Sequence, residues 1–475
     1  MDTKLLKQKI LDFAIRGKLV PQDPNDEPAS VLLERIRAER EKLVAEGKLK
    51  RSKTTTDNRH YENVPFEIPE SWEWCKVEDF SYVASGSTPD KSAFVDNGIP
   101  YLKMYNLKNQ AIDFDYKPQY IKEEVHNGKL QRSRTEVGDL IMNIVGPPLG
   151  KLAIIPPSLP QSNFNQAAVL IRPILQKDTL VRYLFYYLSQ MSEINSIQTR
   201  GNAGQKNISL TQCQNIRVPM PPLSEQKRIV AEIERWFTLI DDIESNKQDL
   251  LDFIKAAKSK ILSLAISGKL VPQDPNDQPA IDLLHGINPN FKSSDNSHYG
   301  NIPESWCVIR LGEIYNHTTG KALKKSNSEG VLREYLTTSN VYWNAFDFSE
   351  VRSMYFTTAE LDKCTVHKGD LLICNGGDVG RAAIWTYDYD ICIQNHISKL
   401  RPKHNGLINN IFCSYIFMYL KEKGLLNGKG VAITSLSAAD ILSIAIPLPP
   451  INEQNRIVLA IQTIEESLQA ITEEL

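Results

Sequence analysis

The chain has few of the features that mark membrane or secreted proteins. None of its apolar runs approaches the roughly 18 residues that a membrane-spanning helix needs. Its seven cysteines are odd in number and form no C-x-x-C pair, which argues against a disulfide framework and against a zinc site. The first ten residues, MDTKLLKQKI, have the pattern of an amphipathic helix and not of a signal peptide. We therefore expect a soluble protein of the reducing cytoplasm, with no membrane partner.

A basic surplus is also missing. The sequence has 55 Lys and Arg residues against 57 Asp and Glu residues, a formal net charge of −2. Proteins that read nucleic acid usually carry an excess of basic residues. Charge alone therefore gives no hint of such a partner, and any basic face has to be produced by folding.

Motifs for catalysis and cofactor binding are absent from the sequence as well. It contains no N-P-P-Y or D-P-P-Y tetrad, no H-E-x-x-H, and no G-x-G-x-x-G after a predicted strand. The segment GPPLGK at 146–151 has the wrong spacing for a phosphate loop, and its prolines lack the N–H donors that such a loop needs. We interpret His396 as an ordinary loop histidine, and Asp139 and Asp370 as turn caps. The sequence predicts no catalytic residue and no metal site.

The longest regular pattern spans residues 224–267, which contain neither proline nor glycine. Apolar residues recur there at alternating steps of four and three, with Lys247 in the one polar slot: Ile229, Ile233, Trp236, Ile240, Ile243, Leu250, Ile254, Ala257, Ile261 and Leu264. A seam of five heptads predicts a helix about 65 Å long that packs against another long helix. A plain amphipathic helix lying on a core is the alternative.

The two ends of the chain repeat this pattern. Apolar residues with the same spacing occur at Ile457, Ile461, Ile464, Leu468, Ile471 and Leu475, and the series continues at Leu6, Ile10 and Phe13. Joined end to end, the last and first segments would make a second rod that is cut in the middle. We expect a circular arrangement in which two rods pack antiparallel and the termini meet halfway along one of them.

The helix ends are duplicated. Residues 9–29 and 260–280 differ at only four of 21 positions. In both copies a glycine that is free to adopt positive φ, Gly17 or Gly268, ends the helix, and a turn segment rich in Pro, Asp and Asn follows. Two interpretations remain open: duplication of a purely structural helix end, or a docking surface that is presented twice.

The segments between the helices are also matched. IPESW occurs at 68–72 and 302–306, and the offset of 234 residues is kept by Gly86 and Gly320, Tyr101 and Tyr335, Leu102 and Leu336, and Asn106 and Asn340. Each half predicts short strands, a helix near 179–198 or 407–423, and an extended proline-flanked segment before the heptad helix. Ser224 or Asn452 is a suitable cap for that helix. Ser30 is a suitable cap for a helix over 31–46, whose counterpart in the second half is only 281–287.

These features together resemble the specificity subunit of a type I restriction–modification enzyme. The resemblance covers the whole chain and rests on the segment order, the duplicated helix ends, the IPESW starts, and PPLSEQKRIV and PPINEQNRIV before the heptad helices. It implies an α+β fold, with two similar α/β target recognition domains separated by long helices that form an antiparallel coiled coil in a pseudo-twofold circular arrangement. The implied segments are 1–60 (N-terminal part of the distal helical region), 61–222 (first recognition domain), 223–298 (central helical spacer and linker), 299–450 (second recognition domain) and 451–475 (C-terminal helix).

The resemblance also implies a function and a set of partners. The chain would be a non-catalytic subunit that reads a bipartite site in double-stranded DNA, one half per recognition domain. It would dock two methyltransferase subunits, and restriction subunits would join through them, for adenine methylation or restriction. S-adenosylmethionine, ATP and Mg²⁺ would be bound by the partner subunits and not by this chain. We interpret heptad-edge charges such as Arg228 and Arg456 mainly as solvated or intrahelical, with a minority facing the methyltransferase subunits.

Candidate DNA contacts are the polar loop residues that could be held by such a scaffold. Lys and Arg suit phosphates, and Asn, Gln, Ser and Lys suit base edges. The candidates are Lys91, Lys103, Tyr105, Asn106, Gln205 and Lys206 in the first half, and Lys321, Lys325, Ser339, Asn340, Asn395 and Lys429 in the second. Because Asn106 and Asn340 occupy equivalent positions, a shared structural or backbone-contact role is favoured for them over base specificity.

Two other classes of function compete with this interpretation. One is a coiled-coil scaffold whose domains bind proteins, or a silent specificity allele. It predicts complex formation that does not depend on DNA. The other is a self-sufficient methyltransferase or nuclease, which the missing motifs disfavour.

Overall fold

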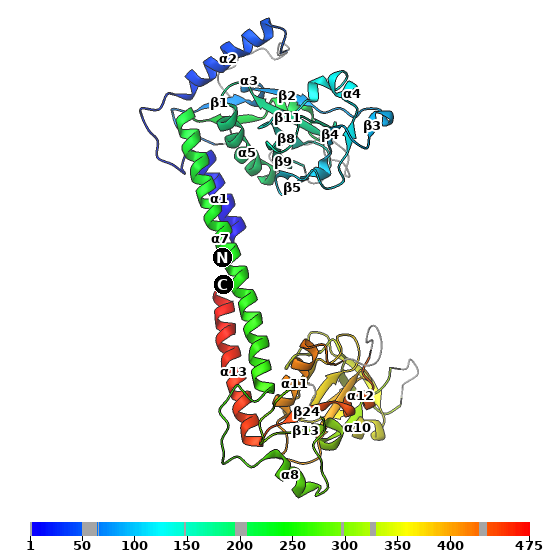
Figure 1. Ribbon diagram of the computed structural model, residues 1–475. Coiled ribbons are helices and arrows are strands. Elements are labelled where there is room, and N and C mark those ends of the chain that lie inside the picture. The colour runs from blue at the N-terminus through cyan, green and yellow to red at the C-terminus, as the bar shows by residue number, and fades with distance from the viewer. Residues whose placement is uncertain are drawn as a thin grey trace. The chain divides into compact units, whose positions relative to one another are not determined.

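The computed structural model describes residues 2–49, 64, 66–146, 149–194, 207–295, 299–323, 329–426 and 435–475. The chain divides into two compact units, residues 1–245 and 246–475, whose boundary falls inside helix α7 (Leu223–Ile266). Each unit combines a globular α/β domain with a terminal helix that lies along part of α7 (Figure 1). The predicted α+β fold class is confirmed.

Helix α7 is continuous over 44 residues, as the heptad pattern predicted. In the first unit α1 (Thr3–Ile15) lies along it, and Lys7 Nζ is 2.5 Å from Asp241 Oδ1. In the second unit the partner is α13 (Ile451–Glu474), and Lys247 Nζ donates to the backbone oxygen of Leu475 at 2.6 Å. Both terminal helices run antiparallel to α7. The polar slot at Lys247 therefore binds the end of the chain.

Only part of the predicted seam is buried. Ile229, Ile233 and Ile240 are at most 1% exposed, whereas Trp236, Ile243 and Leu250 are 37%, 44% and 37% exposed. The expectation of a seam buried along its whole length is wrong for these three residues. Trp236 and Ile243 belong to the first unit and Leu250 to the second, and in each unit the terminal helix leaves these side chains more than a third exposed.

The domain of the first unit is built on two four-stranded sheets, with strand orders β2–β11–β8–β9 and β10–β4–β7–β3, and β1 pairs with β12. Strands β8 and β9 pair as an antiparallel hairpin. Residues 140 and 142 of β8 pack towards α5, and residue 141 packs on the opposite face, as strand alternation requires. The bounds are α2 (Ala29–Ala45), β1 (Glu73–Lys76), α3 (Val77–Phe80), β2 (Ser81–Ser85), η1 (Lys91–Ala93), β3 (Phe94–Val95), β4 (Ile99–Leu102), η2 (Met104–Asn106), β5 (Leu107–Lys108), β6 (Ala111–Ile112), β7 (Tyr120–Ile121), α4 (Glu123–Asn127), η3 (Gln131–Ser133), β8 (Leu140–Asn143), β9 (Leu152–Ile154), β10 (Asn163–Phe164), β11 (Ala168–Pro173), α5 (Lys177–Ile194), α6 (Leu210–Gln214) and β12 (Arg217–Met220).

The domain of the second unit repeats this plan. Its sheets have the orders β14–β23–β20–β21 and β18–β15–β22–β19, and β13 pairs with β24. Helix α11 takes the place of α5 and packs on the first of these sheets. The bounds are α8 (Ala280–Ile287), β13 (Cys307–Arg310), α9 (Leu311–Ile314), β14 (Tyr315–Thr319), β15 (Val331–Leu336), β16 (Val341–Tyr342), β17 (Ala345–Phe346), β18 (Arg352–Phe356), α10 (Thr358–Cys364), β19 (Thr365–Val366), β20 (Leu371–Cys374), β21 (Ala382–Ile384), β22 (Ile391–Ile393), β23 (Ile397–Pro402), α11 (Asn410–Glu422), α12 (Ala438–Ser443) and β24 (Ala445–Leu448).

The predicted glycine caps Gly17 and Gly268 are confirmed by their positive φ, but the predicted N-terminal caps are wrong. Helix α2 begins at Ala29 directly after Pro28, and α13 begins at Ile451 directly after Pro450. Ser30, Ser224 and Asn452 therefore lie inside the first turns of α2, α7 and α13. Proline has a φ compatible with a helix start and lacks only an N–H that would have no helical partner there, so it can precede the helix directly.

The segment that follows α8 is not a free linker. Phe291 is 8% exposed and belongs to the hydrophobic core of the second unit. Ser294 donates its backbone N–H to Val308 O at 2.8 Å, which joins the segment to β13. The linker prediction for the described part of this tract is therefore wrong, because one aromatic side chain is enough to dock it.

Candidate nucleic-acid interface

In the second unit, four loops meet around the turn 375–381 between β20 and β21. Asn375 donates its N–H to His396 O at 2.8 Å, and its carbonyl accepts the N–H of Leu436 at 2.9 Å. Arg381 Nη2 donates to Thr338 O at 2.8 Å. These contacts join the segments 337–340, 375–381, 394–396 and 435–436, which we call the second loop cluster.

The first unit contains the equivalent cluster. Asn165 donates its N–H to Leu102 O at 3.1 Å, and Ser87 donates to Phe164 O at 3.1 Å. Ile144 O accepts the N–H of Ile208 at 2.9 Å. The segments 86–88, 102–106, 144–146, 164–167 and 207–208 therefore come together and form the first loop cluster. Six of the twelve candidate residues from the sequence lie in these segments: Lys103, Tyr105, Asn106, Ser339, Asn340 and Asn395.

Two matched glycines allow this close approach. A Cβ atom added to Gly86 would lie 2.1 Å from Asn165 O, and one added to Gly320 would lie 2.0 Å from Ile393 O. Both distances are far below van der Waals contact, so any side chain would push the neighbouring loop away. The repeated glycine is explained by a backbone crossing at the same place in each cluster.

Two matched asparagines hold the loop beside this crossing. Asn106 Oδ1 accepts the N–H of Lys103 at 2.9 Å, and its Nδ2 donates to two backbone carbonyls at 3.0 and 2.9 Å. Asn340 Oδ1 accepts the N–H of Thr337 at 2.8 Å, and its Nδ2 donates at 2.8 and 2.9 Å to the carbonyls at the same spacing. Both residues are buried. Their amide donors are used within the loop and are not available to a base.

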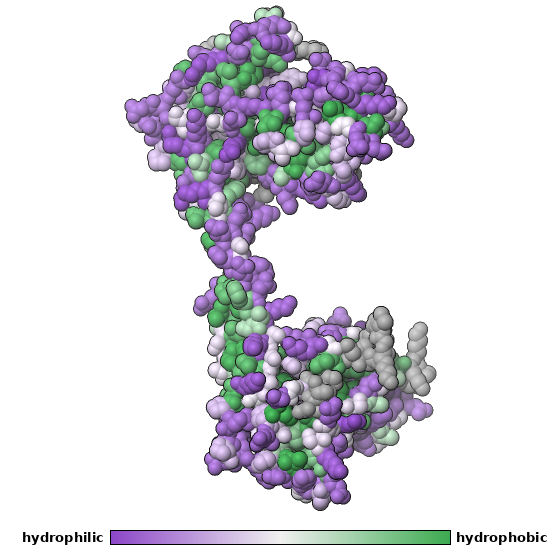
Figure 2. All heavy atoms as spheres, viewed as in Figure 1, coloured by the Kyte–Doolittle hydropathy of each residue, from purple (hydrophilic) through white to green (hydrophobic). Residues whose placement is uncertain are grey.

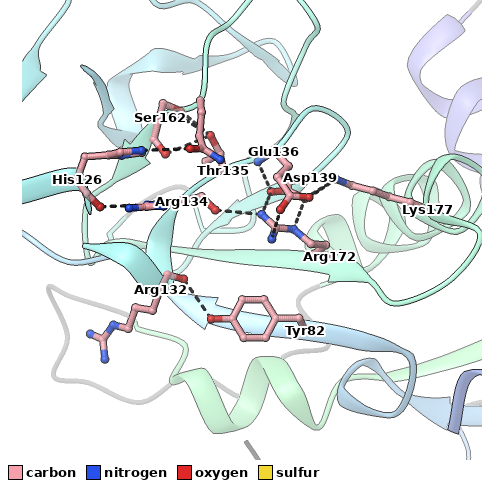
Figure 3. A network of polar contacts seen from close by, with 11 residues as sticks. Tyr82, His126, Arg132, Arg134, Thr135, Glu136, Asp139, Ser162, Arg172 and Lys177 are labelled. Atoms are coloured by element: carbon pink, nitrogen blue, oxygen red, sulfur yellow. Dashed lines mark hydrogen bonds and ion pairs between the residues drawn. The ribbon is translucent and has the colours of Figure 1, made fainter. Parts of the chain in front are cut away.

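An ion-pair network anchors the N-terminal end of β8, the end that lies away from the first loop cluster (Figure 3). The buried Asp139 carboxylate accepts from Arg172 Nη2 at 2.6 Å and pairs with Lys177 Nζ at 2.9 Å. In the second unit Asp370 accepts from Arg401 Nη2 at 2.6 Å, and this hydrogen bond raises the pKa of Arg401. Each aspartate also accepts the backbone N–H of the residue three positions earlier, at 2.6 and 2.8 Å. The predicted turn caps are confirmed, and they also anchor the strands that lead to the loop clusters.

This arrangement of paired domains and helices is also found in known proteins. A family model described as type I restriction modification DNA specificity domain matches residues 69–252 and 303–475. The chain is 26% identical to the type I restriction enzyme EcoAI specificity subunit of Escherichia coli, over 96% of this chain and 87% of that protein. It is also 26% identical to the EcoEI specificity subunit of Escherichia coli, over 97% and 88%. The solved HsdS subunit from Thermoanaerobacter tengcongensis shares the fold with a TM-score of 0.56 at 18% identity, over 86% of this chain and 93% of that chain.

The chain belongs to the type I restriction modification DNA specificity family. Membership confirms the resemblance drawn from the sequence and the prediction of a DNA-specificity subunit that is not itself an enzyme. All seven cysteines are buried and free. Over the residues that the structure describes, no three His, Cys, Asp or Glu side chains are grouped so that they could hold a metal ion. Within the same residues, no helix is both long and apolar enough to cross a membrane.

In the first specificity domain, the predicted contact residues differ in their exposure and in the contacts that their polar groups make within the protein. Lys91 is exposed at the start of η1. Lys103 Nζ lies 5.7 Å from the centre of the Phe94 ring, and Tyr105 donates its hydroxyl to Lys117 O at 3.2 Å. Lys91 and Lys103 therefore carry charges without an acidic partner among the contacts described.

In the second specificity domain, Lys321 is engaged within the protein. Its Nζ donates to Glu360 at 2.6 Å and to Tyr355 O at 2.7 Å, and its side chain is 9% exposed. Ser339 is exposed, with its Oγ 2.6 Å from Thr337 Oγ1. Asn395 is half-buried in the second loop cluster. Four predicted residues lie outside the described part of the chain: Gln205, Lys206, Lys325 and Lys429.

The two arginines assigned to a subunit interface have partners within their own unit. Arg228 Nη2 donates to Asp26 Oδ2 at 2.6 Å, and Arg456 Nη2 donates to Asp277 Oδ2 at 2.7 Å. The interpretation of solvated or intrahelical charges is therefore wrong. Both aspartates lie in the duplicated turn segment, which the heptad pattern alone could not place beside these arginines.

Sequence reasoning did not select three polar residues in or beside the clusters, and it interpreted one of them, His396, as an ordinary loop histidine. Arg132 is exposed and donates Nη2 to Ser87 Oγ at 2.9 Å, and Figure 3 shows its guanidinium directed away from the Asp139 network. His396 is exposed beside Gly376. Asn375 is 6% exposed, and its Oδ1 has no hydrogen-bond partner among the described residues. The glycine-rich turn NGGDVGR, which sits between two predicted strands where the first half has GPPLGK, was the available signal.

Proposed function

We propose that this chain reads a bipartite site in double-stranded DNA, with each loop cluster contacting one half. The observation that carries this proposal is a shared loop skeleton with different side chains. The segments before the matched asparagines read Lys-Met-Tyr at 103–105 and Thr-Thr-Ser at 337–339. Loops that are held by the same backbone contacts but present different donors and acceptors suit two different base sequences.

The net negative charge does not oppose this assignment, because unpaired basic groups gather locally. Lys91, Lys103 and Arg132 all belong to the first loop cluster or to segments that contact it. Such groups can neutralise phosphates, while the amides and hydroxyls of the loops read base edges.

We also propose that the helices dock two methyltransferase subunits, through which restriction subunits join. Large apolar residues are exposed on α7 and α13, among them Phe253 at 72% and Leu459 at 66%. Figure 2 shows hydrophobic residues gathered along the stretch where α13 lies beside α7. Apolar surface of this kind marks protein interaction sites. S-adenosylmethionine, ATP and Mg²⁺ are assigned to these partners, and the complex to the cytoplasm.

Methylome sequencing tests the proposed function. Cells that express this chain with its cognate methyltransferase subunit are compared with cells that lack this chain. The expected result is a new bipartite motif with methylated adenines on both strands. A continuous motif would show that only one domain reads DNA. A stable complex with no new motif would favour the protein-binding scaffold or a silent allele.

A further inference from the structure

A buried glutamate joins the helix pair to the globular domain of the first unit. Glu225, in the first turn of α7, is 1% exposed. Its Oε2 accepts the indole N–H of Trp72 at 2.9 Å, and its Oε1 accepts the amide of Gln22 at 2.5 Å. Trp72 belongs to the IPESW start of the domain, and Gln22 belongs to the turn after α1. One carboxylate therefore holds three segments of different origin.

The second unit repeats this arrangement atom by atom. Glu453 is 1% exposed and lies in the first turn of α13. Its Oε2 accepts the indole N–H of Trp306 at 2.8 Å, and its Oε1 accepts the amide of Gln273. We call each Glu–Trp–Gln set, together with the neighbouring Arg–Asp pair described above, a clasp.

Each clasp leaves little room for movement. A Cβ atom added to Gly17 would lie 2.4 Å from Pro69 Cγ, and one added to Gly268 would lie 2.4 Å from Pro303 Cγ. In both units the alanine that begins the next helix, Ala29 or Ala280, donates its N–H at 3.0 Å to the serine carbonyl of the IPESW motif. The glycine that ends one helix and the alanine that begins the next thus both lie against the IPESW start of the domain.

We propose that Glu225 and Glu453, with Trp72 and Trp306, are positioning residues that set the orientation of each recognition domain on its helices. This proposal rests on the proposed function. The bases that each domain prefers depend on its loops, whereas the separation of the two half-sites depends on how each domain is held. The clasp is the place where the helices determine the pose of the domain. Its duplication explains why residues 9–29 recur as 260–280 and why the IPESW motif at 68–72 recurs at 302–306.

Glu225→Gln and Trp72→Phe are the variants that test the clasp. A glutamine of almost unchanged volume presents an amide N–H₂ to one of the two donors, and phenylalanine, a smaller ring, removes the indole N–H, so each variant loses one buried charge-assisted hydrogen bond. The purified complex with the methyltransferase subunit is assayed on DNA whose spacer is native, one base pair shorter or one base pair longer. We expect the preference for the native spacer over the altered spacers to fall about tenfold, with the base preferences of both half-sites unchanged.

Matched variants make the outcome decisive. Glu453→Gln should reduce the preference for the native spacer by the same factor. The effects of Glu453→Gln and Glu225→Gln should multiply, because the clasps belong to separate units. Arg182→Gln removes an exposed ion pair between α5 and α7 and should leave the spacer preference unchanged. If a buried substitution prevents folding, Gln22→Ala replaces it in the spacer assay, because this variant alters only the exposed side of the clasp.

Three results would overturn the proposal. Equal loss of methylation on all spacers would show a merely structural role. An unchanged spacer preference in the folded variants would show that other contacts set the pose. Absence of bipartite methylation by the wild-type complex would overturn the proposed function itself, and the role of the clasps with it.

Discussion

Asn106 and Asn340 are amides in polar loops, yet their hydrogen bonds are made inside the protein. Each accepts one backbone N–H and donates to two carbonyls, and each is at most 2% exposed. A residue type that suits base contacts can equally close a loop, and burial decides between the two uses.

Asn340→Ala separates these uses. The substitution leaves three backbone groups without partners, and we expect the second unit to lose about 3 kcal/mol in free energy of unfolding. Ser339→Ala, at the exposed neighbouring position, should change stability by less than about 0.5 kcal/mol while weakening recognition of one half-site. Urea unfolding and DNA binding of both variants provide the measurement. Equal stability of the two would contradict the structural role of the asparagine.

The clasp glutamates make a pH-dependent contribution to stability. Burial raises the pKa of Glu225 and of Glu453 above the ordinary value of 4.5, although the hydrogen bonds from tryptophan and glutamine oppose this. A carboxyl group with a raised pKa favours the folded state fully below its unfolded pKa, and the contribution is lost as the pH rises through the folded pKa.

The double variant Glu225→Gln, Glu453→Gln should remove this dependence. The free energy of unfolding of the wild type, minus that of the variant, is expected to fall as the pH rises above 4.5. Asp277, whose pKa Arg456 lowers, contributes with the opposite sign but is present in both proteins and cancels. Urea unfolding at a series of pH values measures the difference, and a difference that is constant with pH would refute the expectation.

Arg132 is expected to contact phosphate. Arg132→Gln should weaken DNA binding and reduce the slope of log K against log salt concentration by about one. Arg35→Gln, at an exposed arginine of α2 that pairs with Glu27, is the control and should leave the slope unchanged. Salt titrations of the methyltransferase complex distinguish the two. An unaltered slope for Arg132→Gln would remove this residue from the interface.

At the scale of elements, α7 is long because its sequence avoids helix breakers, but its surroundings differ along its length. The partner helices α1 and α13 are only 13 and 24 residues long, and four large apolar residues of α7 stay 37–72% exposed: Trp236, Ile243, Leu250 and Phe253. The apolar residues left exposed there are consistent with a surface that receives another subunit.

Phe253→Ser tests this surface. Removing a large, exposed apolar side chain from the centre of an interface should weaken association with the methyltransferase subunit by at least about tenfold, with little effect on the stability of the isolated chain. Leu332→Ser on β15, at a residue that is 54% exposed, is the matched control. Native mass spectrometry or sedimentation gives the stoichiometry. Equal association of both variants with the partner would place the docking surface elsewhere.

At the scale of the whole molecule, the chain is a duplicated unit whose copies keep their framework and differ at the surface. Matched glycines, asparagines, aspartates and clasp residues make the same contacts in both copies. Because the framework of each domain is self-contained, its loops can change without disturbing the other copy.

Exchange of residues 61–222 for the corresponding domain of another family member should therefore change one half of the recognised site only. Methylome sequencing of the hybrid measures this directly. The reciprocal exchange of 299–450 is the control and should change the other half. A change in both halves after either exchange would contradict independent recognition by the two domains.

The elements and their duplication were determined by local sequence. Heptad spacing predicted α7, short apolar and partly β-branched runs predicted strands such as β8, and repeated motifs identified the two domains, because each signal depends on residues that are close along the chain. Only the tertiary structure decided the use of individual polar residues. Glu225 meets Trp72, Arg228 meets Asp26, and Lys321 meets Glu360 across long stretches of chain. Such pairings depend on how distant segments pack, and packing also decides which polar groups are consumed inside the protein and which remain free to contact a ligand.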